Sequence, residues 1–177
     1  MNMTQKYIAN TIVMVKPNHF CFNAETSISN AFQNKPDIGN DDLQHIVKEE
    51  FNSMVKKIRS NGINVIVLES LPNTPDAVFP NNWFSTHIID NNPYVIVYPM
   101  CTKNRRKEVQ IGNLTSNLKK ITGGDYKILD IRSDYSRFLE STGCLYLTMN
   151  IKLLICLYRL VLMRHWQKKY VTNLDTS

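Results

Sequence analysis

The sequence has few of the residues that mark fibrous, disulfide-rich or membrane-spanning proteins. Only 6 glycines and 7 prolines occur in 177 residues, too few for a fibrous or low-complexity chain. The four cysteines lie far apart and form no CxxC pair, which argues against a zinc site and a disulfide framework. Free thiols in a reducing compartment, and therefore a cytoplasmic location, are expected. The longest apolar run, residues 151–163, contains two basic residues and is too short to span a bilayer.

The overall composition is that of a globular domain whose charge is unevenly distributed along the chain. Hydrophobic residues make up 43% of the chain and charged residues 20%, and the length suffices for a sizeable core. Through Glu140 the chain carries 16 Lys and Arg against 14 Asp and Glu, whereas from Ser141 onward it carries 5 against 1. Because the body is nearly neutral and lacks interleaved basic and aromatic residues, we expect no nucleic-acid partner.

The periodicity of the first half predicts alternating strands and helices. A β-rich segment over residues 10–15 precedes a polar loop and a helix over residues 41–61, where apolar residues recur every three or four positions. Asn40 or Asp41 can cap the start of this helix, and a glycine at residue 62 can end it. Residues 63–68 form a continuous apolar run, which is typical of a buried strand.

The second half repeats this pattern with more strands. Strand-like runs are predicted at residues 83–89, 94–98, 126–131, 144–148 and 153–158. An Asp-Asn-Asn-Pro turn separates the first two, and a helix over residues 105–121 follows them. The order strand, strand, helix, strand indicates repeated α/β units, the last of which is incomplete.

The loop over residues 71–87 is dense in groups that bind ligands. It holds three prolines, Asp76 and the adjacent amides Asn81 and Asn82. Stiff loops between core elements often carry function. The alternative is a structural corner in which the two amides bond to the local backbone.

Two further stretches carry charged side chains in suggestive settings. In residues 99–108, Arg105 and Arg106 offer planar guanidinium groups that suit two-point capture of a carboxylate, although a solvated charge cluster is the simpler interpretation. In residues 137–143, Glu140 stands between an apolar pair and small residues that allow close approach of a backbone or ligand, although an isolated glutamate is usually a surface acid.

Together these stretches resemble the guanidino-group-modifying (pentein) superfamily, which includes arginine deiminases, dimethylarginine hydrolases and amidinotransferases. The likeness is greatest to its amidinotransferase-like branch of citrulline-utilising hydrolases, and it covers roughly residues 10–150. It rests on the string PDAVFPNNWFSTH at residues 75–87. Shorter matches are MVKP at 14–17, FCFN at 20–23, YPM at 98–100, NRRKE at 104–108 and FLESTG at 138–143.

The resemblance implies a five-bladed α/β propeller with strand-strand-helix-strand blades around a central active site. The chain would hold about two and a half blades. Residues 1–150 would be the N-terminal part of the propeller domain, and residues 151–177 would form a divergent basic tail. After about residue 150 the sequence departs from the family pattern, as expected of a truncated or frame-altered chain.

The resemblance also implies roles for individual residues. In the superfamily a cysteine thiolate attacks the central carbon of a guanidino or ureido group, a histidine moves protons, and an acid orients that histidine. Glu140 takes the position of the orienting acid. Arg105 or Arg106 would hold the substrate carboxylate, and Asp76 would shape its loop or help to bind the ligand amine.

The amide pair departs from the deiminase pattern. Asn82, with Asn81 beside it, falls where deiminases carry an aspartate that grips the guanidinium. An amide matches a neutral ureido group, whereas a carboxylate balances a positive charge. The departure favours citrulline over arginine as the small-molecule ligand. No cofactor and no metal are expected.

The nucleophilic cysteine and the catalytic histidine of the superfamily have no counterpart in these 177 residues. Cys144 falls in a predicted strand, His87 belongs to the string at residues 75–87, and the neighbours of His165 match no family motif. We therefore expect the substrate-binding part of a hydrolase that acts on the C–N bond of a ureido or guanidino amino acid and is inactive alone.

Two other interpretations stay open. The chain can be a non-catalytic binding module, completed by self-association or by a partner chain, because an open propeller exposes sheet edges and apolar surface. Alternatively, the basic segment 151–171 can form an amphipathic helix that binds a membrane or an acidic partner. Its apolar residues run almost continuously instead of forming one stripe, so membrane binding is not expected.

Overall fold

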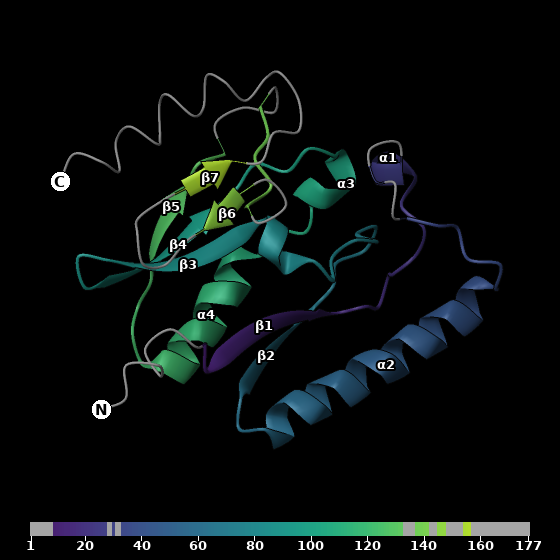
Figure 1. Ribbon diagram of the computed structural model, residues 1–177, viewed down its shortest axis with the longest axis horizontal. Coiled ribbons are helices and arrows are strands. Elements are labelled where there is room, and N and C mark those ends of the chain that lie inside the picture. Colours follow the sequence, from purple (N-terminus) through teal and green to yellow (C-terminus); the bar gives the residue numbers. More distant parts are fainter. Residues whose placement is uncertain are drawn as a thin grey trace. The chain divides into compact units, whose positions relative to one another are not determined.

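The computed structural model describes residues 9–27, 30, 33–132, 137–141, 145–147 and 154–156 (Figure 1). The chain divides into two compact units, each assembled from separate stretches. The first consists of Met1–Pro80 and Thr102–Tyr126, and the second of Asn81–Cys101 and Lys127–Ser177. Strands and helices alternate along the chain, which confirms the predicted α/β class. No helix in the part of the chain that the structure describes is long and apolar enough to cross a bilayer.

Two parallel strands form the centre of the first unit. They are β1 (Thr11–Lys16) and β2 (Asn64–Glu69), and α2 (Asn40–Ser60) lies between them in the sequence, as the connection between parallel strands requires. Both α2 and α4 (Ile111–Thr122) contact β2, and Figure 1 shows the two strands between these helices. Most of the apolar side chains of β2 are buried, as its continuous apolar run predicts.

The start of α2 differs from its prediction, whereas its end agrees. Gly39 is the N-cap, in an extended conformation, and no side chain caps the first turn. The helix begins at Asn40, so that both predicted caps, Asn40 and Asp41, lie inside it. The predicted terminator, Gly62, has a φ of +79° and its N–H bonds to the carbonyl of Arg59, as helix-ending glycines do.

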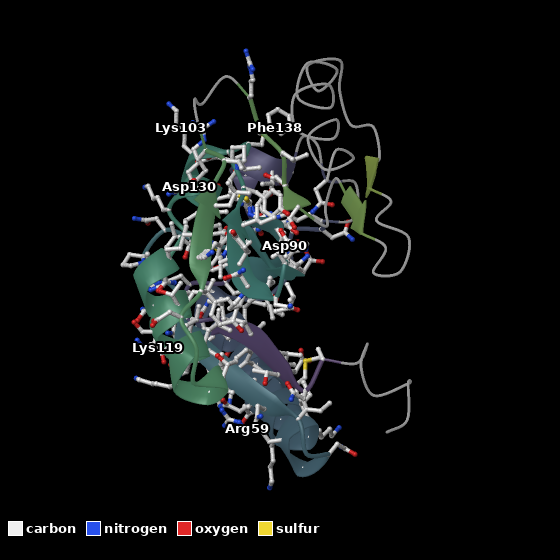
Figure 2. The ribbon with its side chains drawn as sticks, turned by 90° about the vertical axis from the view of Figure 1, so that its left-hand side faces the viewer. Arg59, Asp90, Lys103, Lys119, Asp130 and Phe138 are labelled. Atoms are coloured by element: carbon white, nitrogen blue, oxygen red, sulfur yellow. The ribbon has the colours of Figure 1, made fainter. Side chains whose placement is uncertain are left out.

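Few residues of α2 are buried. Leu43 and Val55 are its buried residues, whereas Ile46 and Met54 of the predicted apolar face are exposed. Arg59, labelled in Figure 2, lies in the last turn, and its Nη2 donates to the carbonyl oxygen of Val65 at 2.9 Å. This bond ties the end of the helix to the strand that follows it.

The predicted helix over residues 105–121 is wrong at its start. The structure has a short α3 (Lys103–Arg106), then a turn, and α4 begins only at Ile111. The backbone leaves the helical region at Gln110 (φ −123°, ψ 61°), whose side-chain amide donates to the carbonyl oxygen of Glu69 at 2.9 Å. The helix is therefore interrupted where the side chain of Gln110 bonds to the end of β2. Gly123 ends α4 with a φ of +74°.

The second unit contains a three-stranded sheet in the order β3-β4-β5. β3 (Phe84–Ile89) and β4 (Asn92–Val97) form an antiparallel hairpin, and β5 (Lys127–Asp130) runs parallel to β4. The turn is tighter than predicted, because Asp90 and Asn91 alone form it with φ values of 48° and 59°. Positive φ at both central residues is the signature of a type I′ turn, whose twist suits a hairpin.

The central strand of this sheet is the most deeply buried. Val95 and Val97 of β4 are completely inaccessible, whereas every residue of β5 is exposed, including Ile128 and Leu129. The short antiparallel pair β6 (Leu145–Leu147) and β7 (Leu154–Cys156) falls within the last two predicted strand segments. The remainder of the predicted tail lies outside the described residues.

Candidate active site

Asn23 connects two stretches of the first unit that carry predicted site residues. Its side chain is buried, Nδ2 donates to Asp76 Oδ2 at 2.6 Å, and Oδ1 accepts from Asn104 Nδ2 at 2.6 Å. Thr26, in α1 (Ala24–Ser27), donates to the same Asp76 oxygen at 3.0 Å. These bonds give Asp76 a part in shaping its loop. That Asp76 binds a ligand amine stays a prediction.

Asn23 was not among the predicted site residues, although it ends the FCFN match. Its Oδ1 also accepts the backbone N–H of Glu25 at 3.1 Å, the arrangement by which an asparagine caps a helix start. Glu25 Oε2 in turn accepts the backbone N–H of Asn104 at 3.1 Å. A polar amide directly before a helix, inside a matching motif, is the signal that could have identified it.

The two adjacent arginines occupy different environments. Arg105 is buried, and its Nε and Nη2 each donate to one carboxylate oxygen of the buried Glu108 at 3.0 Å. Arg105 Nη2 also lies 3.3 Å from the carbonyl oxygen of Phe79. Two-point pairing is strong and directional, so Arg105 fastens the turn after α3 to the loop before residue 80. Arg106 is half-buried, and its backbone N–H bonds to the carbonyl of Thr102.

The amide pair of the second unit precedes a buried aromatic anchor. Asn81 and Asn82 belong to a short 3-10 helix, Pro80–Asn82, and Asn81 Nδ2 donates to Asn82 Oδ1 at 2.9 Å. The first amide therefore orients the second. Trp83 follows with no accessible surface, its ring centroid 4.6 Å from that of Phe84. Its indole Nε1 has no hydrogen-bond partner among the described residues.

Glu140 is attached to the segment that follows β4. Its Oε1 accepts the backbone N–H of Cys101 at 3.0 Å, and the N–H of Leu139 donates to the carbonyl of Pro99 at 2.9 Å. Ser141 is fully buried and has a φ of +23°, which is uncommon for a residue other than glycine. One bond holds the carboxylate and the other holds the backbone beside it, as suits an orienting acid. The role itself stays a prediction.

The structure thus distributes the predicted residues over two groups. The stretches of Asp76, Arg105 and Arg106 belong to the first unit, whereas Asn81, Asn82 and Glu140 belong to the second. Within the second unit, the residue after the amide pair and the residue before Glu140 attach to consecutive positions. Trp83 O accepts the N–H of Tyr98 at 2.9 Å, and Pro99 O accepts the N–H of Leu139 at 2.9 Å. Cys144 and His165 lie outside the described residues.

A hydrogen-bonded chain runs along one face of the hairpin. Ser85 Oγ lies 2.7 Å from His87 Nε2 and 2.7 Å from the Tyr98 hydroxyl. Burial lowers the pKa of His87 and raises the pKa of Tyr98. Both rings are therefore uncharged near neutral pH.

Most of the chain matches one known family. Residues 16–159 match the model of the family described as N,N dimethylarginine dimethylhydrolase, eukaryotic. The chain belongs to this family. Membership confirms the predicted guanidino-group-modifying superfamily. The match continues to residue 159, past the point near residue 150 where the sequence is expected to diverge from the family. No curated protein matches the sequence.

Similar solved structures share the fold at low sequence identity. A dimethylarginine dimethylaminohydrolase in an adduct with S-methyl-L-thiocitrulline gives a TM-score of 0.52 at 14% identity, covering 80% of this chain and 48% of its own. The arginine dihydrolase ArgZ from cyanobacteria gives 0.57 at 15% identity, covering 84% and 20%. The N-terminal domain of ArgZ, covalently bound to a reaction intermediate, gives 0.59 at 14% identity, covering 92% and 54%. The chain therefore has the pentein α/β fold and spans about half the length of the first of these enzymes.

Proposed function

We propose that this chain binds a ureido amino acid, with citrulline preferred over arginine, as the substrate-binding part of a hydrolase that acts on a C–N bond. The observation that carries the proposal is the amide pair, in which Asn81 donates to Asn82 and so orients it. An amide satisfies a neutral ureido group by hydrogen bonds, whereas a guanidinium ion would lack its counter-charge there. Membership of a dimethylarginine hydrolase family supports the reaction class.

In this proposal the remaining residues divide into binding and supporting groups. Arg106 holds the substrate carboxylate, because its side chain is half-buried, whereas the guanidinium of Arg105 is buried against Glu108. Asp76 shapes its loop, since one of its oxygens already receives hydrogen bonds from Asn23 and a neighbouring threonine. Glu140 orients the group that transfers protons.

The proposal includes a catalytic deficit. The 177 residues supply no cysteine or histidine in a motif that matches the nucleophile or the proton carrier. Loss of a nucleophile alone lowers rates by several orders of magnitude. The chain would then contribute about two and a half blades of a five-bladed propeller, without cofactor or metal, and further blades would have to supply the missing groups.

Isothermal titration calorimetry of the purified chain tests the binding step. L-citrulline, L-arginine and dimethylarginine are titrated in parallel, with L-ornithine as the control that keeps the amine and carboxylate but lacks the ureido group. We expect citrulline to bind at least about 10-fold more tightly than arginine, a difference of about 1.4 kcal/mol. Equal or tighter binding of arginine would overturn the preference.

An assay for released ammonia and methylamines tests the deficit separately. We expect no multiple turnover with any of the three ligands. Steady release at a constant rate per mole of protein would show that the chain is a complete enzyme.

A second candidate, a non-catalytic module that associates with another chain, is favoured by the exposed strand β5. Ile128 and Leu129 present apolar side chains on an edge strand that pairs only with β4 among the described strands. Such edges invite pairing with another chain. Size-exclusion chromatography with light scattering separates the candidates, because a clean monomer that binds citrulline argues against the module.

A further inference from the structure

Ser85, His87 and Tyr98 lie on one face of the β3–β4 hairpin. Ser85 and His87 are two positions apart on β3, and the partner of Ser85 on β4 is Ile96, two positions before Tyr98. Residues two apart share a face of a sheet, and diagonal pairs across strands are within reach of long side chains. The Ser85 hydroxyl, 2.7 Å from both ring groups, can donate to one of them and accept from the other.

Tyr98 also borders the segment that carries Glu140. Burial raises the pKa of Tyr98, and the hydroxyls of Ser85 and Ser141 partly offset this rise. The Ser141 hydroxyl is thus near the phenol, although it makes no hydrogen bond of normal geometry among the described residues. The backbone just beyond Tyr98 binds the same segment, through the Cys101 N–H and Glu140 Oε1 at 3.0 Å.

We propose that Ser85, His87 and Tyr98 form a hydrogen-bonded chain that positions Glu140 and responds to the protonation of His87. With neutral His87, the Ser85 hydroxyl donates to Nε2 and accepts from the Tyr98 hydroxyl. A proton taken up from solvent places a hydrogen on Nε2, which reverses both bonds and turns the phenol hydrogen away from Ser85, towards Ser141. All three are positioning residues, and their functional meaning rests on the proposed role of Glu140.

Among the described residues, the elements next to this chain carry few charged groups, and Asp130 at the end of β5 is one of them. Of the residues in β3 and β4, only His87 and Tyr94 are titratable, and they are paired opposite each other. Lys127 of β5 lies with its Nζ 5.6 Å from the centroid of the Tyr94 ring, and Asp90 is in the turn beyond β3. Since burial lowers the pKa of His87, the imidazole takes up its proton only in solution more acidic than an exposed histidine requires.

Nuclear magnetic resonance of the whole chain tests the coupling. Selective 15N-cysteine labelling leaves four backbone amides to follow, and Cys101→Ser assigns the one that binds Glu140. The ring resonances of His87, assigned by their loss in His87→Gln, report its pKa. We expect the Cys101 amide to show an inflection at the pKa of His87. We expect Tyr98→Phe and Ser85→Ala each to abolish that inflection while His87 still titrates.

The matched control is Tyr94→Phe, which removes the other tyrosine hydroxyl near His87 and should leave the inflection intact. Tyr98→Phe deletes a single oxygen, and Ser85→Ala is the second variant should the first fail to fold. A wild-type Cys101 amide without an inflection at the pKa of His87 would overturn the proposal, as would an inflection that survives in the folded Tyr98 and Ser85 variants. No ligand is used, so this outcome is independent of the citrulline titration.

Discussion

Arg105 and Glu108 are joined by two hydrogen bonds of 3.0 Å, and both side chains are almost completely buried. Charges removed from water in this way contribute little net stability as a pair, but either one left alone is costly. The sequence motif NRRKE, interpreted as a ligand-binding cluster, thus also contains a structural ion pair. Substitutions can therefore distinguish the structural role of Arg105 from the proposed ligand-binding role of Arg106.

Glu108→Gln is expected to lower the free energy of unfolding by about 3–5 kcal/mol, because it leaves the buried Arg105 guanidinium without a counter-charge. Arg106→Lys is the matched control, since it keeps the charge of a half-buried side chain and is expected to change stability by about 0.5 kcal/mol or less. Urea unfolding followed by circular dichroism measures both. Similar losses in the two variants would contradict the structural role of the pair.

Asn82→Asp is expected to move the ligand preference from citrulline towards arginine. The new carboxylate balances a guanidinium charge, but it lacks the N–H that an amide can donate to the ureido oxygen. We expect the ratio of the two dissociation constants to change by about 10-fold or more, as measured by calorimetry. Asn113→Asp adds the same charge on the exposed face of α4 and should leave the ratio unchanged. A shift of the same size in the control would point to net charge instead of position.

Asn23→Asp is expected to destabilise the first unit more at pH 7 than near pH 4. The substitution replaces the donor that bonds to Asp76 Oδ2 at 2.6 Å with a second carboxylate. Two adjacent carboxylates repel until one of them takes up a proton. Asn23→Ala, which only leaves its partners unsatisfied, should cost about 1–3 kcal/mol with little dependence on pH. Thermal unfolding at the two pH values distinguishes the variants.

His87 should make the stability of the chain fall in mild acid. Burial lowers its pKa in the folded state below the value of 6.5 found in the unfolded chain. Below pH 6.5 the unfolded state therefore binds more protons than the folded state, and stability is lost as the pH falls towards the folded pKa. His87→Gln should remove this part of the pH dependence. Urea midpoints at several pH values between about 5 and 8 check it, and identical slopes for both proteins would rule it out.

Element types could be predicted because local pattern determines them. The apolar run of β2 and the glycine that ends α2 encode burial and backbone conformation within a few residues. The break before α4 could not be predicted, because it depends on a hydrogen bond from Gln110 to Glu69, 41 positions away. The shorter hairpin turn depends on positive φ at Asp90 and Asn91, which only the paired strands reveal.

Some features of the candidate site were likewise predictable from local sequence, and others were not. Motifs singled out Asn82 and Glu140 as candidates, because their neighbours in sequence carry the resemblance, and their roles stay predictions. The linking role of Asn23 could not be predicted, because its partners Asp76 and Asn104 are 53 and 81 positions away. Whether an arginine faces a ligand or an internal acid likewise depends on burial, which a charged pentapeptide does not encode.

The interleaving of the two units has a consequence for biosynthesis. The chain leaves the first unit after Pro80, re-enters it at Thr102, and leaves it again after Tyr126. On the ribosome, the β3–β4 hairpin emerges before α4, which supplies contacts to β2. The nascent first unit therefore keeps part of its apolar surface exposed until α4 has been synthesised. Neither unit can be obtained by trimming the gene at one end.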